Sequence, residues 1–331
     1  MNHCRQTRKR MAPTVSVIIP TYRHAAYVHE ALESVFAQTF VDFEVIVVND
    51  GSPDNTDEVV APYVKTGRIR YIKQENQGQA AARCCGLAVA RGEFIALLDD
   101  DDLWPEDKLE WQVRHLREFL NIGLVGGSFE VLHAETGRVS RVDSTPGLVS
   151  WTALFDQCPF CSPGQTLVRA SLLRQVGAFD QSIWGADDYD MYFRIARCSG
   201  IWRSDKVSLR YRVHSNNASK STERMLANSK RVLDRQFAYL PSDDPEACRR
   251  RGMRYLYQYG GRRLALSFHE NMAAGRLSRA LSDLSGIRHF IPSVFADSCL
   301  FYWILKDFAV PLAIRTALNR HLGRKSSFVR R

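Results

Sequence analysis

The stretch Phe-Ile-Ala-Leu-Leu-Asp-Asp-Asp-Asp, residues 94–102, joins a short apolar run to four consecutive carboxylates. A short apolar run bounded by polar residues is typical of a strand that is buried on both faces. Carboxylates crowded at the end of such a strand repel one another unless a cation lies nearby, and Mg²⁺ or Mn²⁺ commonly takes one or two of them as ligands. The stretch therefore indicates either a cation site or a solvated acidic turn that caps the helix expected after Trp104.

Similar apolar runs alternate with helical patterns along the first hundred residues. This alternation predicts an α/β fold with a mostly parallel sheet and helices on both of its faces. In such sheets ligands bind outside the carboxyl ends of the strands, so the residues after each strand are the first candidates for function. The predicted strands are 15–19, 43–48, 69–72 and 94–98, and the predicted helices are 24–38, 55–65 and 78–90.

The pattern changes further along the chain. Between residues 105 and 219 it is mixed α/β, with a helix after Pro105, a helix near 148–156, and the segments 124–133, 166–173 and 207–213. Beyond Ser219 it is almost purely helical, over 222–239, 247–273, 277–286 and 297–320. We expect a basic tail at 1–13, a catalytic domain at 14–219 with halves at 14–104 and 105–219, and a basic helical region at 220–331.

The net charge of +9 is confined to the last third of the chain. Residues 1–219 carry 24 Lys and Arg against 27 Asp and Glu, whereas residues 220–331 carry 21 against 9. The acidic part is the expected seat of the chemistry, and the basic part favours an anionic partner. Arg249–Arg251 with nearby tyrosines would suit nucleic acid, but no nucleic-acid module is recognisable. An anionic membrane surface is the partner that we expect instead.

Composition and missing motifs exclude several classes of protein. No apolar run reaches the roughly 18 residues that span a bilayer, so an integral membrane protein is not expected. The eight cysteines are scattered, and the one Cys-x-x-Cys, Cys158–Cys161, has no second pair for a zinc site. Reduced thiols in a cytoplasmic protein are the simple interpretation. The chain also lacks the glycine-rich fingerprints of dinucleotide oxidoreductases and of P-loop enzymes.

Two more strand ends carry polar residues. Pro20, Thr21 and Tyr22 follow the first strand, and Asp50 and Ser52 follow the second. Asp50 and Asp99 are separated by about one strand-helix-strand-helix unit, and both follow strands. They can therefore line the same crevice at the carboxyl ends of the strands. An aspartate at this place can accept hydrogen bonds from a nucleotide base or a ribose, or it can stabilise the turn.

Three polar positions lie outside these strand ends. Arg83 is the cation of a helix that opens with small residues, and it suits a diphosphate or a strand-end carboxylate. Asp187, Asp188 and Asp190 lie in the first turn of another predicted helix, where helix capping explains one or two of the three acids but not all, which favours a functional role. His214 ends a strand, where it could be a metal ligand or a packed core residue.

The ordered set of motifs resembles the family 2 glycosyltransferases, which share the GT-A fold. The resemblance covers residues 14–219 approximately. The matching segments are Val17–Tyr22, Ser34–Phe40, Val48–Ser52, Ala90–Ala96, Leu98–Asp102 and Val176–Asp180.

This resemblance implies a role for each matching residue. Pro20, Thr21, Tyr22, Asp50, Ser52 and Arg83 would form the nucleotide site, with Asp50 on the N–H edge of the base. Asp99–Asp101 would be the Asp-x-Asp element, in which Asp99 or Asp100 lies near the ribose and Asp101 binds the metal. His214 would approach the metal or the diphosphate. Asp188 would be the catalytic base, with Asp187 as the alternative because a glutamate is usual at its place.

The resemblance implies an inverting, metal-dependent transfer of a sugar from a nucleoside diphosphate, with uridine diphosphate as the expected carrier and Mg²⁺ or Mn²⁺ as the cofactor. The acceptor would be a glycan or a lipid-linked molecule in cell-surface polysaccharide synthesis. Processive synthases of the family carry a Gln-x-x-Arg-Trp element and membrane spans, which this sequence lacks. The alternatives are a nucleic-acid-binding protein and a sugar nucleotidyltransferase, although the glycine-rich basic first loop of the latter is absent.

The segment 297–320 is the most apolar part of the chain, interrupted by Lys306 and Asp307 and by Pro311. It is expected either to pack on the catalytic domain or to attach the protein to the inner face of a membrane.

Overall fold

The computed structural model describes residues 12–214, 217, 222–240 and 245–290. The chain divides into two compact units. The first runs to Leu154 and continues over Cys158–Asn217, and the second combines Phe155–Gln157 with the chain from Ala218 onward.

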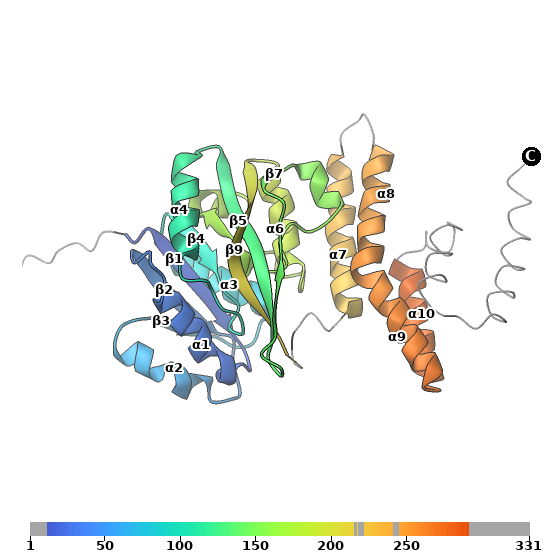
Figure 1. Cartoon of the computed structure of the whole chain (residues 1–331), viewed down its shortest axis with the longest axis horizontal. Helices are drawn as coiled ribbons and strands as arrows, with labels where there is room; N and C mark the ends of the chain where they lie inside the picture. Colours follow the sequence, from blue (N-terminus) through green and yellow to red (C-terminus); the bar gives the residue numbers. More distant parts are fainter. Residues whose placement is uncertain (1–11, 215–216, 218–221, 241–244, 291–331) are drawn as a thin grey trace, which may run out of the picture. The chain divides into compact units, whose positions relative to one another are not determined.

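The first unit is built on a nine-stranded sheet in which β3, β2, β1 and β4 lie side by side and parallel (Figure 1). The order continues with β8, β5, β9 and β7, and β6 pairs with β5. Of the described strands, β8, β6 and β7 run against the others. The strands are β1 (Val15–Thr21), β2 (Phe43–Asn49), β3 (Arg70–Lys73), β4 (Phe94–Leu97), β5 (Ile122–His133), β6 (Val139–Val142), β7 (Gly147–Val149), β8 (Leu167–Arg169) and β9 (Gly200–Val213).

Helices cover both faces of this sheet. Val17 and Ile19 of β1 belong to one apolar core with residues of α1, α2 and α4. Ile18 points to the opposite face, where a Cβ on Gly86 of α3 would lie 2.4 Å from it, so α3 packs this closely because it has a glycine there. Burial of each such Val or Ile contributes about 1.5–3 kcal/mol. The helices of this unit are α1 (Ala25–Phe36), α2 (Thr56–Lys65), α3 (Gln79–Val89), α4 (Lys108–Glu118), α5 (Ala170–Gln175) and α6 (Asp187–Ala196).

The predicted α/β fold with a mostly parallel sheet is confirmed, and the first four strands and three helices lie where the sequence predicts them. The later segments differ. The helix predicted near 148–156 is a 3-10 turn, Trp151–Phe155, because residues 147–149 pair with β9 as β7. The segment 166–173 divides into β8 and α5, since residues 167–169 fill the space between β4 and β5.

The second unit is helical in its described part, as predicted. Its helices are α7 (Thr222–Gln236), α8 (Pro245–Leu256), α9 (Arg262–Ala273) and α10 (Leu277–Phe290). The helix predicted at 247–273 is interrupted by a π-helical turn, Tyr257–Gly261. A Cβ on Gly260 in this turn would lie 2.9 Å from Leu226 of α7, so the glycine permits the close approach of the two segments.

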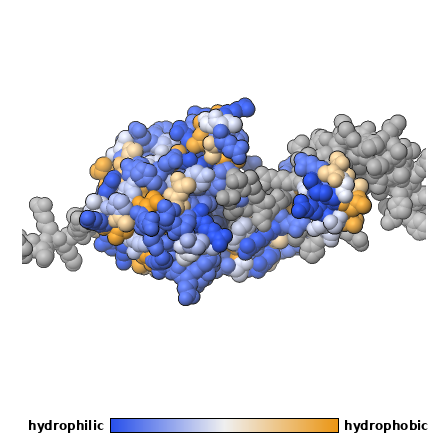
Figure 2. Space-filling model, turned by 90° about the horizontal axis from the view of Figure 1, so that it is seen from below, coloured by the Kyte–Doolittle hydropathy of each residue, from blue (hydrophilic) through white to orange (hydrophobic). Residues whose placement is uncertain are grey.

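The predicted segment 297–320 lies outside the described residues. None of the helices in the described ranges combines the length and the apolar character needed to cross a bilayer. On the face drawn in Figure 2, hydrophobic residues of the described chain form small, scattered patches in a largely hydrophilic surface.

Candidate active site

The ends of β1, β2 and β4 meet at one edge of the sheet because these strands are neighbours and parallel. Thr21 lies opposite Asn49 in the register, and the Asp50 amide donates to the Thr21 carbonyl at 2.9 Å. The Tyr22 amide donates to the Asp100 carboxylate at 3.2 Å. The three polar strand ends singled out in the sequence therefore lie together.

Asp50 is buried at the end of β2, where its carboxylate holds the loop that leads into α3. It accepts hydrogen bonds from the Gln74 side chain at 2.8 Å and from the amides of Gln77 and Gly78 at 2.9 and 2.8 Å. The turn-stabilising role considered for Asp50 is thus observed. Three bonds leave room for one more, since a carboxylate has about four acceptor positions.

Pro20, Thr21 and Ser52 are buried beside Asp50, and Tyr22 is half-buried. The Ser52 hydroxyl accepts a hydrogen bond from the Arg23 amide at 3.1 Å. Thr21 Oγ1 has no hydrogen-bond partner among the described residues, although it is buried. A buried hydroxyl without a partner is costly, so this atom is a candidate for contact with a ligand.

Arg83 joins the acidic end of β4 to the start of α6. Its guanidinium donates to Asp99 Oδ1 and to Asp187 Oδ2, each at 2.7 Å, and its side chain is 2% exposed. Burial disfavours the charged form of Arg83, but the charges of Asp187 and Asp99 outweigh this effect and raise its pKa. The cation therefore stays charged and holds two acids that lie 88 positions apart in the sequence.

The two acids at the start of α6 differ in their surroundings. Asp187 is buried, and its oxygens accept from Arg83 and from the Gln79 side chain, the latter at 3.2 Å. Asp188 is half-buried, and among the described residues it accepts from the Tyr189 amide alone, at 2.8 Å. Burial and the charge of Asp187 raise the pKa of Asp188 to about 7, against the opposing effect of Arg83. Asp188 is thus the acid with the capacity to accept a proton near neutral pH.

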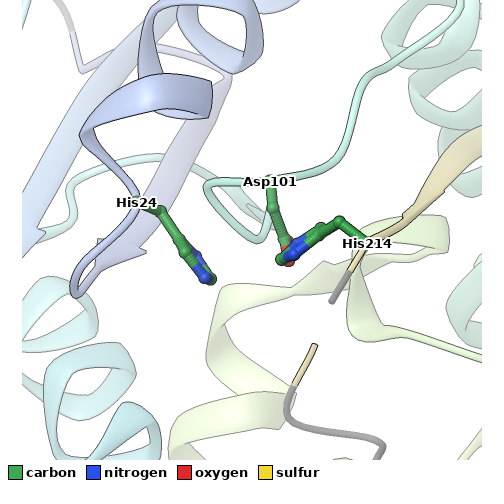
Figure 3. A group of neighbouring side chains, drawn as sticks. All are labelled: His24, Asp101 and His214. Atoms are coloured by element: carbon green, nitrogen blue, oxygen red, sulfur yellow. The ribbon is translucent and has the colours of Figure 1, made fainter. Parts of the chain in front are cut away.

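A second cluster lies on the other side of the acidic turn. His214, at the end of β9, is 2.9 Å from Asp101 through its Nε2 atom. His24, just before α1, points toward the same space, and ligand atoms of His24, Asp101 and His214 lie within 4.8 Å of one another (Figure 3). Asp101 and His214 were predicted from the sequence, whereas His24 was not. The place of His24 three residues after the end of β1 could have signalled it.

The protonation of this cluster reflects its crowded acids. Burial and the charges of Asp100 and Asp99 raise the pKa of Asp101 to about 6, while its hydrogen bond to His214 opposes the shift. Burial lowers the pKa of His24, but the hydrogen bond to Asp100 and the charges of the neighbouring acids together raise it to about 9. Positive charge is therefore favoured here, as it is in a cation site.

Each of the four consecutive acids has a different partner. Asp99 accepts from Arg83 and from the Ser162 hydroxyl, and Asp100 from the Tyr22 amide and His24. Asp101 pairs with His214, and Asp102, fully buried, accepts from the Arg212 amide at 2.8 Å. The alternative of a turn that caps the following helix is wrong, because that helix begins after Asp107 and has no side-chain cap.

Two imidazoles and a carboxylate form a donor set that suits a divalent metal ion. The nitrogen atoms come from His24 and His214 and the oxygen from Asp101. In the part of the chain that the structure describes, these three residues form the group whose ligand atoms lie close enough together to hold an ion.

Comparison with known proteins places the part of the chain that carries most of the site in a family. Residues 16–177 match the model of glycosyl transferase family 2. This segment belongs to that family. The family 2 segment contains the nucleotide-side candidates and the acidic turn, whereas Asp187, Asp188 and His214 follow it. The resemblance seen in the sequence motifs is confirmed.

An uncharacterized glycosyltransferase of Rickettsia prowazekii is 32% identical over 209 residues, which is 62% of this chain and 65% of that protein. The alignment with a second uncharacterized glycosyltransferase, from Rickettsia felis, covers 35% of its length. The chain thus matches less than two thirds of the length of these relatives.

Two solved structures share the GT-A type fold of the family 2 domain. The mannosyltransferase PcManGT of Pyrobaculum calidifontis, in complex with GDP-Man and Mn²⁺, has a TM-score of 0.58 and 21% identity over 89% of this chain and 84% of that one. S. aureus TarS in complex with UDP-GlcNAc has a TM-score of 0.56 and 18% identity over 83% of this chain and 92% of that one.

Proposed function

We propose that the protein transfers a sugar from a nucleoside diphosphate to an acceptor hydroxyl, with inversion at the anomeric carbon. One observation carries this proposal. Arg83 forms ion pairs with Asp187 and with Asp99 but not with Asp188. Asp188 accepts from the Tyr189 amide through one oxygen, so its other carboxylate oxygen is available near the acidic turn. A single displacement requires a base on one side of the sugar and stabilisation of the leaving group on the other.

The donor nucleotide would bind at the ends of β1 and β2, against Pro20, Thr21, Tyr22, Asp50 and Ser52. The unpartnered hydroxyl of Thr21 and the remaining acceptor position of Asp50 support this assignment. Arg83 and Asp99 would border the ribose and diphosphate. We propose a uridine nucleotide, in line with the UDP-GlcNAc complex of TarS; the GDP-Man complex of PcManGT makes guanosine the alternative.

Asp101 and His214 would hold Mg²⁺ or Mn²⁺. The donor set fits such an ion, and PcManGT is described with Mn²⁺. When bound, the ion supplies Lewis-acid stabilisation of the charge that develops on the diphosphate.

Asp188 would act as the base. It would take the proton from the acceptor hydroxyl while the new bond from oxygen to the anomeric carbon forms and the bond to the diphosphate oxygen breaks. Its pKa of about 7 lies close to the working pH, which favours proton transfer. Asp187 is less suited to this task because Arg83 and Gln79 hold its two oxygens.

The acceptor would be a glycan or a lipid-linked molecule, and the reaction would add a single sugar during cell-surface polysaccharide synthesis. We place the protein in the cytoplasm, with its basic C-terminal region in contact with an anionic membrane surface. The net positive charge of residues 220–331 supports this location.

A donor screen tests the function directly. Release of nucleoside diphosphate is measured with UDP- and GDP-sugars, each with Mn²⁺, with Mg²⁺ and with EDTA. We expect metal-dependent release from one nucleotide class, and release at least about 100-fold slower from the variant Asp188→Asn. Equal release by the Asp188→Asn variant would show that Asp188 is not the base. Absence of release from every donor tested would contradict the proposed transferase activity.

A further inference from the structure

His24 and Asp100 form a hydrogen-bonded pair beside the Asp101–His214 contact. His24 Nδ1 lies 2.7 Å from Asp100 Oδ1, and the other oxygen of Asp100 accepts from the Tyr22 amide at 3.2 Å. Both oxygens of Asp100 therefore have protein partners, and both partners come from the segment that follows β1. Two of the roughly four acceptor positions of Asp100 are thus taken by the protein, one on each oxygen.

The pair fixes which nitrogen of His24 is available. An ionised carboxylate accepts hydrogen bonds and donates none, so Nδ1 of His24 must carry the proton in this contact. In the neutral ring, Nε2 then carries the lone pair. A histidine that binds a metal through one nitrogen almost always donates its other N–H to a carboxylate, a carbonyl or a water, which sets its tautomer and orientation.

The neighbouring rings hold His24 in place. The centroids of the His24 and His214 rings are 5.4 Å apart with an interplanar angle of 89°, and the Tyr27 ring lies 4.7 Å from His214 and 6.0 Å from His24. The approach of His214 is fixed as well, because the Asn217 side chain accepts from its amide at 2.6 Å and donates to Asp101 at 3.4 Å. Each of the three side chains that carry the ligand atoms is thus positioned by contacts with other residues.

We infer that His24 is a third protein ligand of the metal, oriented by Asp100, in a two-histidine, one-carboxylate site that binds Mn²⁺ in preference to Mg²⁺. This inference rests on the proposed function, for which Asp101 and His214 would already hold the ion. The preference follows from the donor atoms. Mg²⁺ prefers oxygen ligands and gives up its water reluctantly, whereas imidazole nitrogen suits the first-row transition metals.

The competing interpretation is that His24 is a permanent cation that neutralises Asp100 and binds no metal. The two interpretations differ in the number of nitrogen atoms on a bound ion. Pulsed EPR of Mn²⁺ bound to the full chain with saturating UDP or GDP detects coupling to ¹⁴N of coordinated imidazole. We expect coupling to two imidazoles in the wild type and to one in His24→Ala.

Affinity gives a second readout. Titration of MnCl2, followed by the EPR signal of free Mn²⁺, should show at least about 10-fold weaker binding for Asp100→Asn and up to about 100-fold for His24→Ala. His29→Ala is the matched control, because His29 lies on α1 and hydrogen-bonds to Tyr63 instead. His24→Gln replaces His24→Ala if the latter does not fold, as judged by circular dichroism. MgCl2 should displace Mn²⁺ only at more than about 100-fold excess.

Coupling to one imidazole in the wild type, lost in His214→Ala and kept in His24→Ala, would overturn the inference and leave the proposed function intact. Displacement of Mn²⁺ by an equal concentration of Mg²⁺ would overturn the preference. Sugar transfer in EDTA by a wild type that binds no Mn²⁺ would contradict the inference and the metal dependence of the proposed function together.

Discussion

The two units of this protein handle charge in opposite ways. In the first, Arg83 and Asp187 form an ion pair whose side chains are 2% and 1% exposed. In the second, the pair of Arg251 and Asp156 is 35% and 51% exposed. Burial of an ion costs several kcal/mol, which its partners must offset, whereas an exposed pair contributes about 0–1 kcal/mol. The difference teaches that Asp187 is held at a specific place by a buried cation, while Asp156 belongs to a solvated surface.

Replacement of Arg83 by alanine should have the largest effect on stability, because it removes the buried ion pair on which the contrast between the two units rests. It would leave the buried Asp187 and the half-buried Asp99 without their cation, and we expect the free energy of unfolding to fall by about 3–5 kcal/mol. Urea denaturation followed by tryptophan fluorescence is suited to the measurement, since most tryptophans lie in the first unit. Arg83→Lys should recover part of the lost free energy of unfolding, because lysine keeps the positive charge but lacks the planar guanidinium that donates to two carboxylates at once. A loss below about 1 kcal/mol would contradict the central role of Arg83.

Asp188→Asn should lower kcat by about 10²- to 10⁴-fold, the usual contribution of a general base. The donor affinity should stay nearly unchanged, because the proposed donor contacts lie elsewhere. Steady-state kinetics and calorimetry with the nucleotide diphosphate measure the two quantities. Asp143→Asn is the control, an acid that is 69% exposed and paired with Arg141. A weaker donor affinity with unchanged kcat would show that Asp188 binds the donor instead.

The pH dependence sharpens the same assignment. A base works in its deprotonated form, so kcat/KM should rise about 10-fold per pH unit below the Asp188 pKa of about 7 and level off above it. Saturating Mn²⁺ keeps the metal ligands from titrating in this range. Arg83→Lys changes the surroundings of Asp187 and should therefore shift the midpoint of the profile. A profile that stays flat from pH 5 to 8 would rule out Asp188 as the base.

The smallest effect is expected in the second unit. Arg251→Ala removes the exposed pair with Asp156, and we expect the free energy of unfolding to change by no more than about 1 kcal/mol. The same denaturation experiment, followed by circular dichroism of the helices, makes the measurement. A loss as large as that of Arg83→Ala would mean that the contrast between the two units does not hold.

Much of the first unit could be predicted because its signals are local. Phe94–Leu98 is apolar throughout and Val15–Ile19 is apolar except for Ser16, as is typical of strands covered by helices on both faces. The strands β6 and β7 were missed because they are short and mostly exposed, and their hydrogen bonds come from β5 and β9. Local sequence carries no signal for such a pairing.

The candidate site was predicted as a set of residue types more than as a set of contacts. Asp101, His214, Asp187 and Asp188 were selected for their places at the ends of elements. His24 could have been found from its place three residues after the end of β1, whereas Ser162 could not, because its hydrogen bond to Asp99 spans 63 residues.

The sequence by itself determined that acids follow a buried strand, that a parallel sheet gathers polar strand ends, and that the positive charge lies in the last third of the chain. The tertiary structure alone decided which acid meets which partner. Arg83 reaches Asp187 across 104 positions, and His214 reaches Asp101 across 113. Such distances are closed by the order of the strands in the sheet, and the surroundings that shift the pKa of Asp188 exist only once that order is formed.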